Sequence, residues 1–282
     1  DVYKRQNEDG MKFHLPTVLL FTLIAISHPS VAADEGSTTQ TDGATLRLLA
    51  IGPDKDGMVR GALAVDLKPG WKTYWIAPGQ AGLAPVLDFS ASDGLDGAPA
   101  LRFPVPHVTD DGFSSSNVYS EPMAIAFTAQ ASSGAPRLDL KLTIGLCDDI
   151  CIPVQARLQR DLAEKATLGE TAEVHAAEAA LPDIATDHLE ARIEGKSLVV
   201  TLPPEIPSGP VALFAAGPPG WEFGQAEAPS PTDGAATVVA PVLRAPKDAK
   251  DGIAVDLLLA AGEYARFRPA NPVAIAPDAA LR

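Results

Sequence analysis

The chain has 282 residues, of which 46% are hydrophobic, and a formal net charge of −14 at pH 7. This length accommodates one large domain or two of ordinary size. A chain this acidic repels nucleic acid and anionic membrane surfaces, so we expect no nucleic-acid partner, although solubility alone accounts for the charge.

The beginning of the chain has the pattern of an exported protein. Residues 1–10 precede Met11 and show no structural pattern, so they are left out of the interpretation. From Met11, a basic residue, an apolar run at 19–26 and small residues at 30–33 predict a cleavable signal peptide over 11–33. The run is too short for a membrane anchor, which needs ~20 apolar residues, and we expect no membrane span in the mature chain. The predicted location is the periplasm.

The segment 44–160 reads as a series of short β-strands, preceded by a polar and flexible leader at 34–43. A Gly-Pro-Asp-Lys-Asp-Gly turn separates the first two strands. Two prolines in the segment 101–108 favour a sheet edge. Seven or so strands over ~120 residues predict an all-β, immunoglobulin-like sandwich. The predicted strands are Ala44–Ile51, Met58–Leu67, 70–75, 101–108, 122–131, 138–146 and 152–158.

Both cysteines of the chain, Cys147 and Cys151, lie in one short stretch with three residues between them. A disulfide needs Cα atoms about 4.4–6.8 Å apart, whereas a straight strand would separate these two by roughly 13 Å. The chain must therefore turn, most simply as a hairpin with Asp148, Asp149 and Ile150 as its loop. Pro153 then limits the ladder pairing just beyond the second cysteine.

A disulfide this local is a poor brace for a domain. Chain entropy gives about 2 kcal/mol for a five-residue ring, against about 4.7 kcal/mol for a ring of a hundred residues. This difference favours a redox-active pair over a structural staple, which stays the alternative. Two thiols without nearby His or Met make a weak metal site, and the sequence indicates no cofactor.

The second half of the chain changes in composition. An Ala- and Glu-rich stretch at 162–181, ended by Pro182, predicts a helical linker over 161–186. Strands return from residue 188, and we expect a second, smaller β-sandwich domain over 187–282. The stretch 217–221 reads as an exposed turn with a packed Trp221. The predicted strands of this half are 189–193, 198–202, 211–215, 237–243 and 253–260.

Motifs of other chemistries are missing. The sequence contains no G-x-S-x-G, no P-loop and no dinucleotide fingerprint. His107 lies in the first half near the other candidate residues, and a structural role is the simpler interpretation for it.

Several first-half motifs together resemble the N-terminal periplasmic domain of the disulfide reductase DsbD, and more closely its copper-sensitivity relative ScsB. ScsB also has a second β domain. The motifs are Gly70–Tyr74, Phe103–Pro106, Asp110–Phe113, Tyr119 and Cys147–Pro153. The resemblance implies an immunoglobulin-like domain at 44–160 whose cysteine pair relays electrons to thioredoxin-fold periplasmic partners.

The resemblance also implies roles for single residues. Cys151 would form mixed disulfides and Cys147 would resolve them. Phe113, with Asp111 alongside, would cap the pair, and Tyr74 would lie near it. Because the sequence contains neither a membrane domain nor a C-x-x-C segment, we expect a membrane thiol reductase to be a separate protein. Copper tolerance and cytochrome c biogenesis are the pathways that the resemblance suggests.

The charges near the cysteines fit a passive relay. Lys141 is the only basic residue between Leu138 and Gln155, while two aspartates lie inside the ring. Negative charge beside the thiols and the lack of nearby cations disfavour the thiolate form, so the reduced cysteines should be poor nucleophiles by themselves. Their disulfide can still be attacked by a partner's thiolate. The sequence therefore predicts a thiol-disulfide oxidoreductase. The alternatives are a non-catalytic β-sandwich binding module with an inert disulfide, and a periplasmic copper-binding protein.

Overall fold

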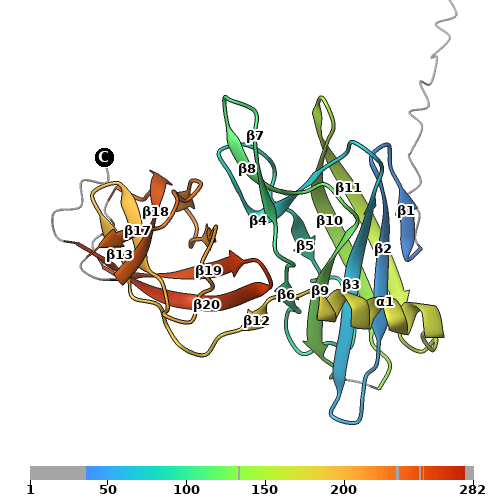
Figure 1. Ribbon diagram of the computed structural model, residues 1–282. Coiled ribbons are helices and arrows are strands. Elements are labelled where there is room, and N and C mark those ends of the chain that lie inside the picture. The colour runs from blue at the N-terminus through green and yellow to red at the C-terminus, as the bar shows by residue number, and fades with distance from the viewer. Residues whose placement is uncertain (1–35, 133, 233–234, 248, 250, 277–282) are drawn as a thin grey trace, which may run out of the picture. The chain divides into compact units, whose positions relative to one another are not determined.

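The computed structural model describes residues 36–132, 134–232, 235–247, 249 and 251–276 (Figure 1). The predicted signal peptide at 11–33 lies outside the described residues. Within them, no helix combines the length and the apolar character needed to cross a membrane. The regular structure of the described chain consists of β-strands and one α-helix, as the sequence predicted.

One sheet of the first half runs in the order β1-β2-β3-β9-β6, and all its neighbours are antiparallel. The bounds of β2 and β3 coincide with two predicted strands, because each is an apolar-rich and largely buried run that ends at a Gly- and Asp-rich turn. The leader was not predicted to be structured, yet β1 pairs with β2. The strands are β1 (Thr38–Gln40), β2 (Ala44–Ile51), β3 (Met58–Leu67), β6 (Ala100–Arg102) and β9 (Met123–Gln130).

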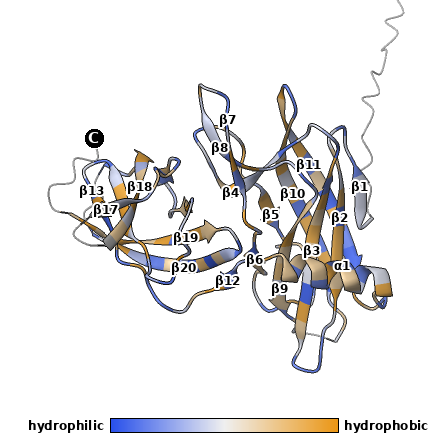
Figure 2. Ribbon diagram, viewed as in Figure 1, coloured by the Kyte–Doolittle hydropathy of each residue, from blue (hydrophilic) through white to orange (hydrophobic). Residues whose placement is uncertain are grey.

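The facing layer consists of two three-stranded sheets, β11-β10-β5 and β4-β8-β7. An antiparallel bridge between Lys72 and Cys147 connects them. Residues of both layers, including Leu48 and Leu140, share one buried core, as expected for an immunoglobulin-like sandwich (Figure 2). The strands are β4 (Thr73–Gly79), β5 (Val86–Asp88), β7 (His107–Asp110), β8 (Ser115–Tyr119), β10 (Arg137–Cys147) and β11 (Cys151–Asp161).

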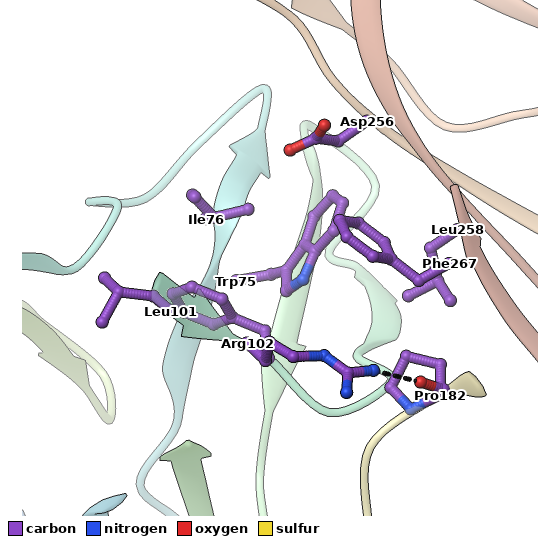
Figure 3. A pocket seen from close by; sticks show the side chains of 9 residues that line it. Trp75, Ile76, Leu101, Arg102, Pro182, Asp256, Leu258 and Phe267 are labelled. Atoms are coloured by element: carbon purple, nitrogen blue, oxygen red, sulfur yellow. Dashed lines mark hydrogen bonds between the residues drawn. The ribbon is translucent and has the colours of Figure 1, made fainter. Parts of the chain in front are cut away.

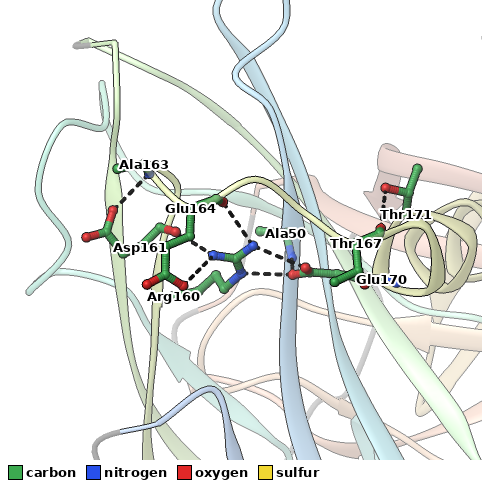
Figure 4. A network of polar contacts seen from close by, with 8 residues as sticks. All are labelled: Ala50, Arg160, Asp161, Ala163, Glu164, Thr167, Glu170 and Thr171. Carbon is green, nitrogen blue, oxygen red and sulfur yellow. Dashed lines mark hydrogen bonds and ion pairs between the residues drawn. The ribbon is translucent and has the colours of Figure 1, made fainter.

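The single helix α1 (Leu168–Ala179) packs on β2, β3 and β9 through the buried Val174 and Ala177. Its N-cap Thr167 accepts a hydrogen bond from the backbone of Glu170. The Glu170 carboxylate binds the Arg160 guanidinium at 2.9 Å and also accepts from a backbone N–H of β2 (Figure 4). The predicted linker helix is therefore attached to the first-half sheet.

The second half forms a nine-stranded sheet with its own core. Trp221 is buried beside the turn that precedes it, as predicted. The sequence did not predict β20, because Pro269 and Pro272 interrupt its pattern; Ala270 between them has φ +50°. The strands are β12 (Asp183–Ile184), β13 (Ala191–Glu194), β14 (Ser197–Thr201), β15 (Ala212–Ala216), β16 (Glu222–Phe223), β17 (Ser230–Thr232), β18 (Ala235–Arg244), β19 (Ile253–Ala261) and β20 (Tyr264–Ile275).

Candidate functional site

The two cysteines close the β10–β11 hairpin. Cys147 and Cys151 are directly opposite in the antiparallel register, with Cα atoms 4.1 Å apart, and form a disulfide. Asp148, Asp149 and Ile150 make the exposed loop. The predicted tight hairpin is therefore confirmed, and the two extended strands carry the disulfide at their tip.

The two halves of the disulfide differ in exposure. Cys147 is fully buried, and its backbone N–H and C=O are both hydrogen-bonded to Lys72, at 2.9 and 2.8 Å. Cys151 begins the outer strand β11 and is exposed. An approaching thiolate therefore meets the Cys151 residue first, while Cys147 is enclosed between β4 and β11.

Tyr74 contacts both sulfur atoms. Its hydroxyl lies 2.9 Å from Cys147 Sγ and 3.1 Å from Cys151 Sγ. The residue is 3% exposed, and burial raises the pKa of its phenol. The phenol therefore stays protonated at neutral pH and can donate its hydrogen to sulfur. The preceding Thr73 donates to the Gly145 carbonyl at 2.9 Å, which aligns β4 with β10.

Two glycines flank the Tyr74 ring. A Cβ atom on Gly82, which has φ +117°, would lie 2.2 Å from Tyr74 Cε1. A Cβ atom on Gly145 would lie 3.2 Å from Tyr74 Cδ2. Only glycine permits this close approach at Gly82, so the ring is held between two backbone surfaces with its hydroxyl at the sulfurs. The sequence did not single out Gly82 for this role; its only signal was a glycine in a loop after a predicted strand.

The predicted cap residues lie on the β7–β8 hairpin. The side chain of Phe113 is 98% exposed, so it does not cover the disulfide in this structure. Asp111 accepts hydrogen bonds from the backbone N–H groups of Ser114 and Phe113, and these bonds lower the pKa of its carboxyl. Asp111 therefore shapes the turn that carries Phe113, and the role of the cap stays a prediction.

The remaining polar candidates lie outside the sulfur contacts. His107 is exposed and hydrogen-bonded to Ser120 Oγ at 3.1 Å, as expected of a structural histidine. Lys72, the residue bridged to Cys147, was not identified as a neighbour from the sequence, because it is distant along the chain. In the described part of the chain, no three His, Cys, Asp or Glu side chains gather as metal ligands would.

Comparisons with known proteins agree with this geometry. Residues 47–163 match the family model described as thiol:disulfide interchange protein DsbD, N-terminal. The crystal structure of the N-terminal periplasmic domain of ScsB from Proteus mirabilis is similar, with a TM-score of 0.69 and 21% sequence identity. The similarity covers 86% of this chain and 99% of that chain, and at this identity it establishes the shared fold. A search of curated proteins gave no match.

The matched segment contains the whole disulfide site. It spans Tyr74, Gly82, both cysteines and the hairpin that carries Phe113. The resemblance that the sequence indicated is therefore confirmed. Residues 47–163 match the N-terminal domain family of the thiol:disulfide interchange protein DsbD, and the chain as a whole has the fold of the ScsB N-terminal region.

Proposed function

We propose that the chain is a periplasmic thiol-disulfide oxidoreductase that exchanges its Cys147–Cys151 disulfide with thioredoxin-fold partners. The observation that carries the proposal is the Tyr74 hydroxyl, placed within hydrogen-bonding distance of both sulfurs of an unequally exposed disulfide. A purely structural disulfide needs no such group, whereas a site in which the disulfide is opened must stabilise the sulfur that leaves as a thiolate.

The exchange follows from this geometry. A partner thiolate attacks Cys151 Sγ, the S–S bond breaks, and its electron pair goes to Cys147 Sγ. The Tyr74 hydroxyl donates a hydrogen bond to the thiolate formed there. Cys151 is now in a mixed disulfide with the partner. A second thiol of the partner attacks the partner's sulfur in that mixed disulfide and releases Cys151. The partner is thereby oxidised to a disulfide, and the Cys147–Cys151 pair is reduced by two electrons.

The reverse sequence would reduce a partner. The Cys151 thiolate would attack the partner's disulfide, and Cys147 would then resolve the mixed disulfide. By the family resemblance, a membrane thiol reductase would supply the electrons, and the pathway would be copper tolerance or cytochrome c biogenesis. The Phe113 hairpin would cover the cysteine pair between encounters with partners, because burying a fully exposed Phe side chain lowers the free energy.

Trapping tests the assigned roles. Cys147→Ala leaves Cys151 free to form a mixed disulfide that cannot be resolved, so covalent complexes with periplasmic thioredoxin-fold proteins should accumulate on a non-reducing gel. Cys151→Ala should give none. Equal trapping by the two variants would contradict the assignment.

A redox titration of the unmodified chain tests the function itself. Structural disulfides of secreted proteins titrate below about −300 mV, and a relay should titrate above that value. A potential below it would favour the binding module with an inert disulfide.

A further inference from the structure

Strand β4 carries Tyr74 on one of its faces and Trp75 on the opposite face. Successive side chains of a strand point to opposite sides. Tyr74 points to the sulfurs, and the next residue, Trp75, points the other way and is only 1% exposed. Any force that positions Trp75 therefore also positions the Tyr74 hydroxyl, because the two residues share one peptide bond.

The partners of Trp75 come from the second half of the chain. The ring of Phe214 in β15 packs edge-on against Trp75, with centroids 5.9 Å apart and an interplanar angle of 62°. Leu258 in β19 is the cross-strand partner of Phe214 and belongs to the same buried cluster as Trp75. Figure 3 shows Leu258, with Phe267 of β20, beside the Trp75 indole.

Phe214 and Leu258 lie on the faces of β15 and β19 that point away from the core of the second half. Their neighbours Leu213, Leu257 and Leu259 point into the core of the second half. Phe214 and Leu258 point out of that core and are nonetheless 3% and 1% exposed, because the first-half cluster covers them. The second half thus presents two large, almost fully buried apolar side chains whose burial depends on the first-half cluster to which Trp75 of β4 belongs.

Strand β4 needs this support because its own ladder is irregular. It pairs with β8 at Thr73 and Tyr74 and then only at Gly79, with a register shift between. Trp75 therefore lies where regular backbone pairing stops, and side-chain packing must set its position. The segment that follows reaches Gly82 against the Tyr74 ring and lines a cavity of about 440 Å³ together with β15 and β16.

We infer that Phe214 is a positioning residue for the disulfide site: through Trp75 it holds β4, and thereby the Tyr74 hydroxyl, at the sulfurs. The inference rests on the proposed function and gives the second half of the chain a part in exchange. Leu258 supports Phe214 from the neighbouring strand. No residue of the second half needs to touch the sulfurs for this effect.

The test is the rate at which reduced thioredoxin, used as a probe, reduces the disulfide of the full chain, followed by acid quench and thiol alkylation. Phe214→Ala should slow exchange about tenfold, since small displacements of reacting groups cost one to two orders of magnitude in rate. The matched control is Leu198→Ala, a fully buried position in the core of the second half that does not belong to the Trp75 cluster. It should destabilise the chain comparably and leave the exchange rate within about twofold of wild type.

A double-variant cycle separates positioning from general damage. If Phe214 acts through the Tyr74 hydroxyl, Phe214→Ala should slow exchange little further in a chain that already carries Tyr74→Phe. Independent, multiplicative effects would overturn the inference, as would equal slowing by Leu198→Ala or a wild-type rate in Phe214→Ala. Phe214→Leu, which keeps an apolar side chain, replaces the alanine variant if that one does not fold. A wild-type chain that thioredoxin cannot reduce would instead refute the proposed function.

Discussion

Replacing Tyr74 by Phe removes one oxygen atom from the disulfide site and keeps the ring between Gly82 and Gly145. The lost hydroxyl lies 2.9 Å from the sulfur of the fully buried Cys147, which in the proposed exchange carries the negative charge after attack on Cys151. A hydrogen bond to a charged group contributes about 1.5–3 kcal/mol. At about 1.36 kcal/mol per factor of ten, exchange should slow about 10- to 150-fold.

The assay is the same thioredoxin reduction, with free energies of unfolding measured in parallel. A disulfide sulfur is a weak acceptor, so Tyr74→Phe should change the stability of the oxidised chain by less than about 1 kcal/mol. The matched control is Tyr119→Phe: this buried hydroxyl donates to the Pro104 carbonyl at 2.8 Å and touches no sulfur. A rate for Tyr74→Phe within twofold of that control would show that the hydroxyl only fills space, and the proposed chemistry would be wrong.

Two further predictions concern stability. Glu170→Ala leaves the Arg160 guanidinium, 9% exposed, without its carboxylate and should lower the free energy of unfolding by about 3 kcal/mol. The Glu164 carboxylate is 83% exposed and lies 3.9 Å from the same guanidinium, so Glu164→Ala should change the free energy of unfolding by less than about 0.5 kcal/mol. Urea titrations of both variants measure the difference. The hydrogen-bonded Arg157 holds the pKa of Asp139 below its ordinary value of 3.8, so this carboxylate stabilises the fold above that pH and loses the contribution as pH falls through the lowered pKa. Asp139→Asn should therefore flatten the fall of unfolding free energy below about pH 4, and an unchanged acid limb in a pH series of urea titrations would contradict this reasoning.

The sequence was sufficient to predict the features that depend on residues close together along the chain. Apolar-rich runs between turn residues predicted β2 and β3 to the residue, because nearly every side chain of these strands is buried or half-buried. The three-residue spacing of Cys147 and Cys151 required the hairpin, because a disulfide cannot join distant Cα atoms. The strand β20 escaped prediction, because its prolines are accommodated by an interrupted backbone and by neighbours far away in the sequence.

The sequence by itself determined the all-β class and the hairpin that joins Cys147 to Cys151, since each depends on residues close together along the chain. The family resemblance placed Tyr74 near the pair, but only the tertiary structure decided which atoms contact the sulfurs. Tyr74 reaches them across 73 residues, Gly82 makes room for its ring, and Phe214 contacts the strand that carries it from a different half of the chain. Such contacts follow from how sheets pack rather than from any local preference, so no spacing or periodicity could have predicted them.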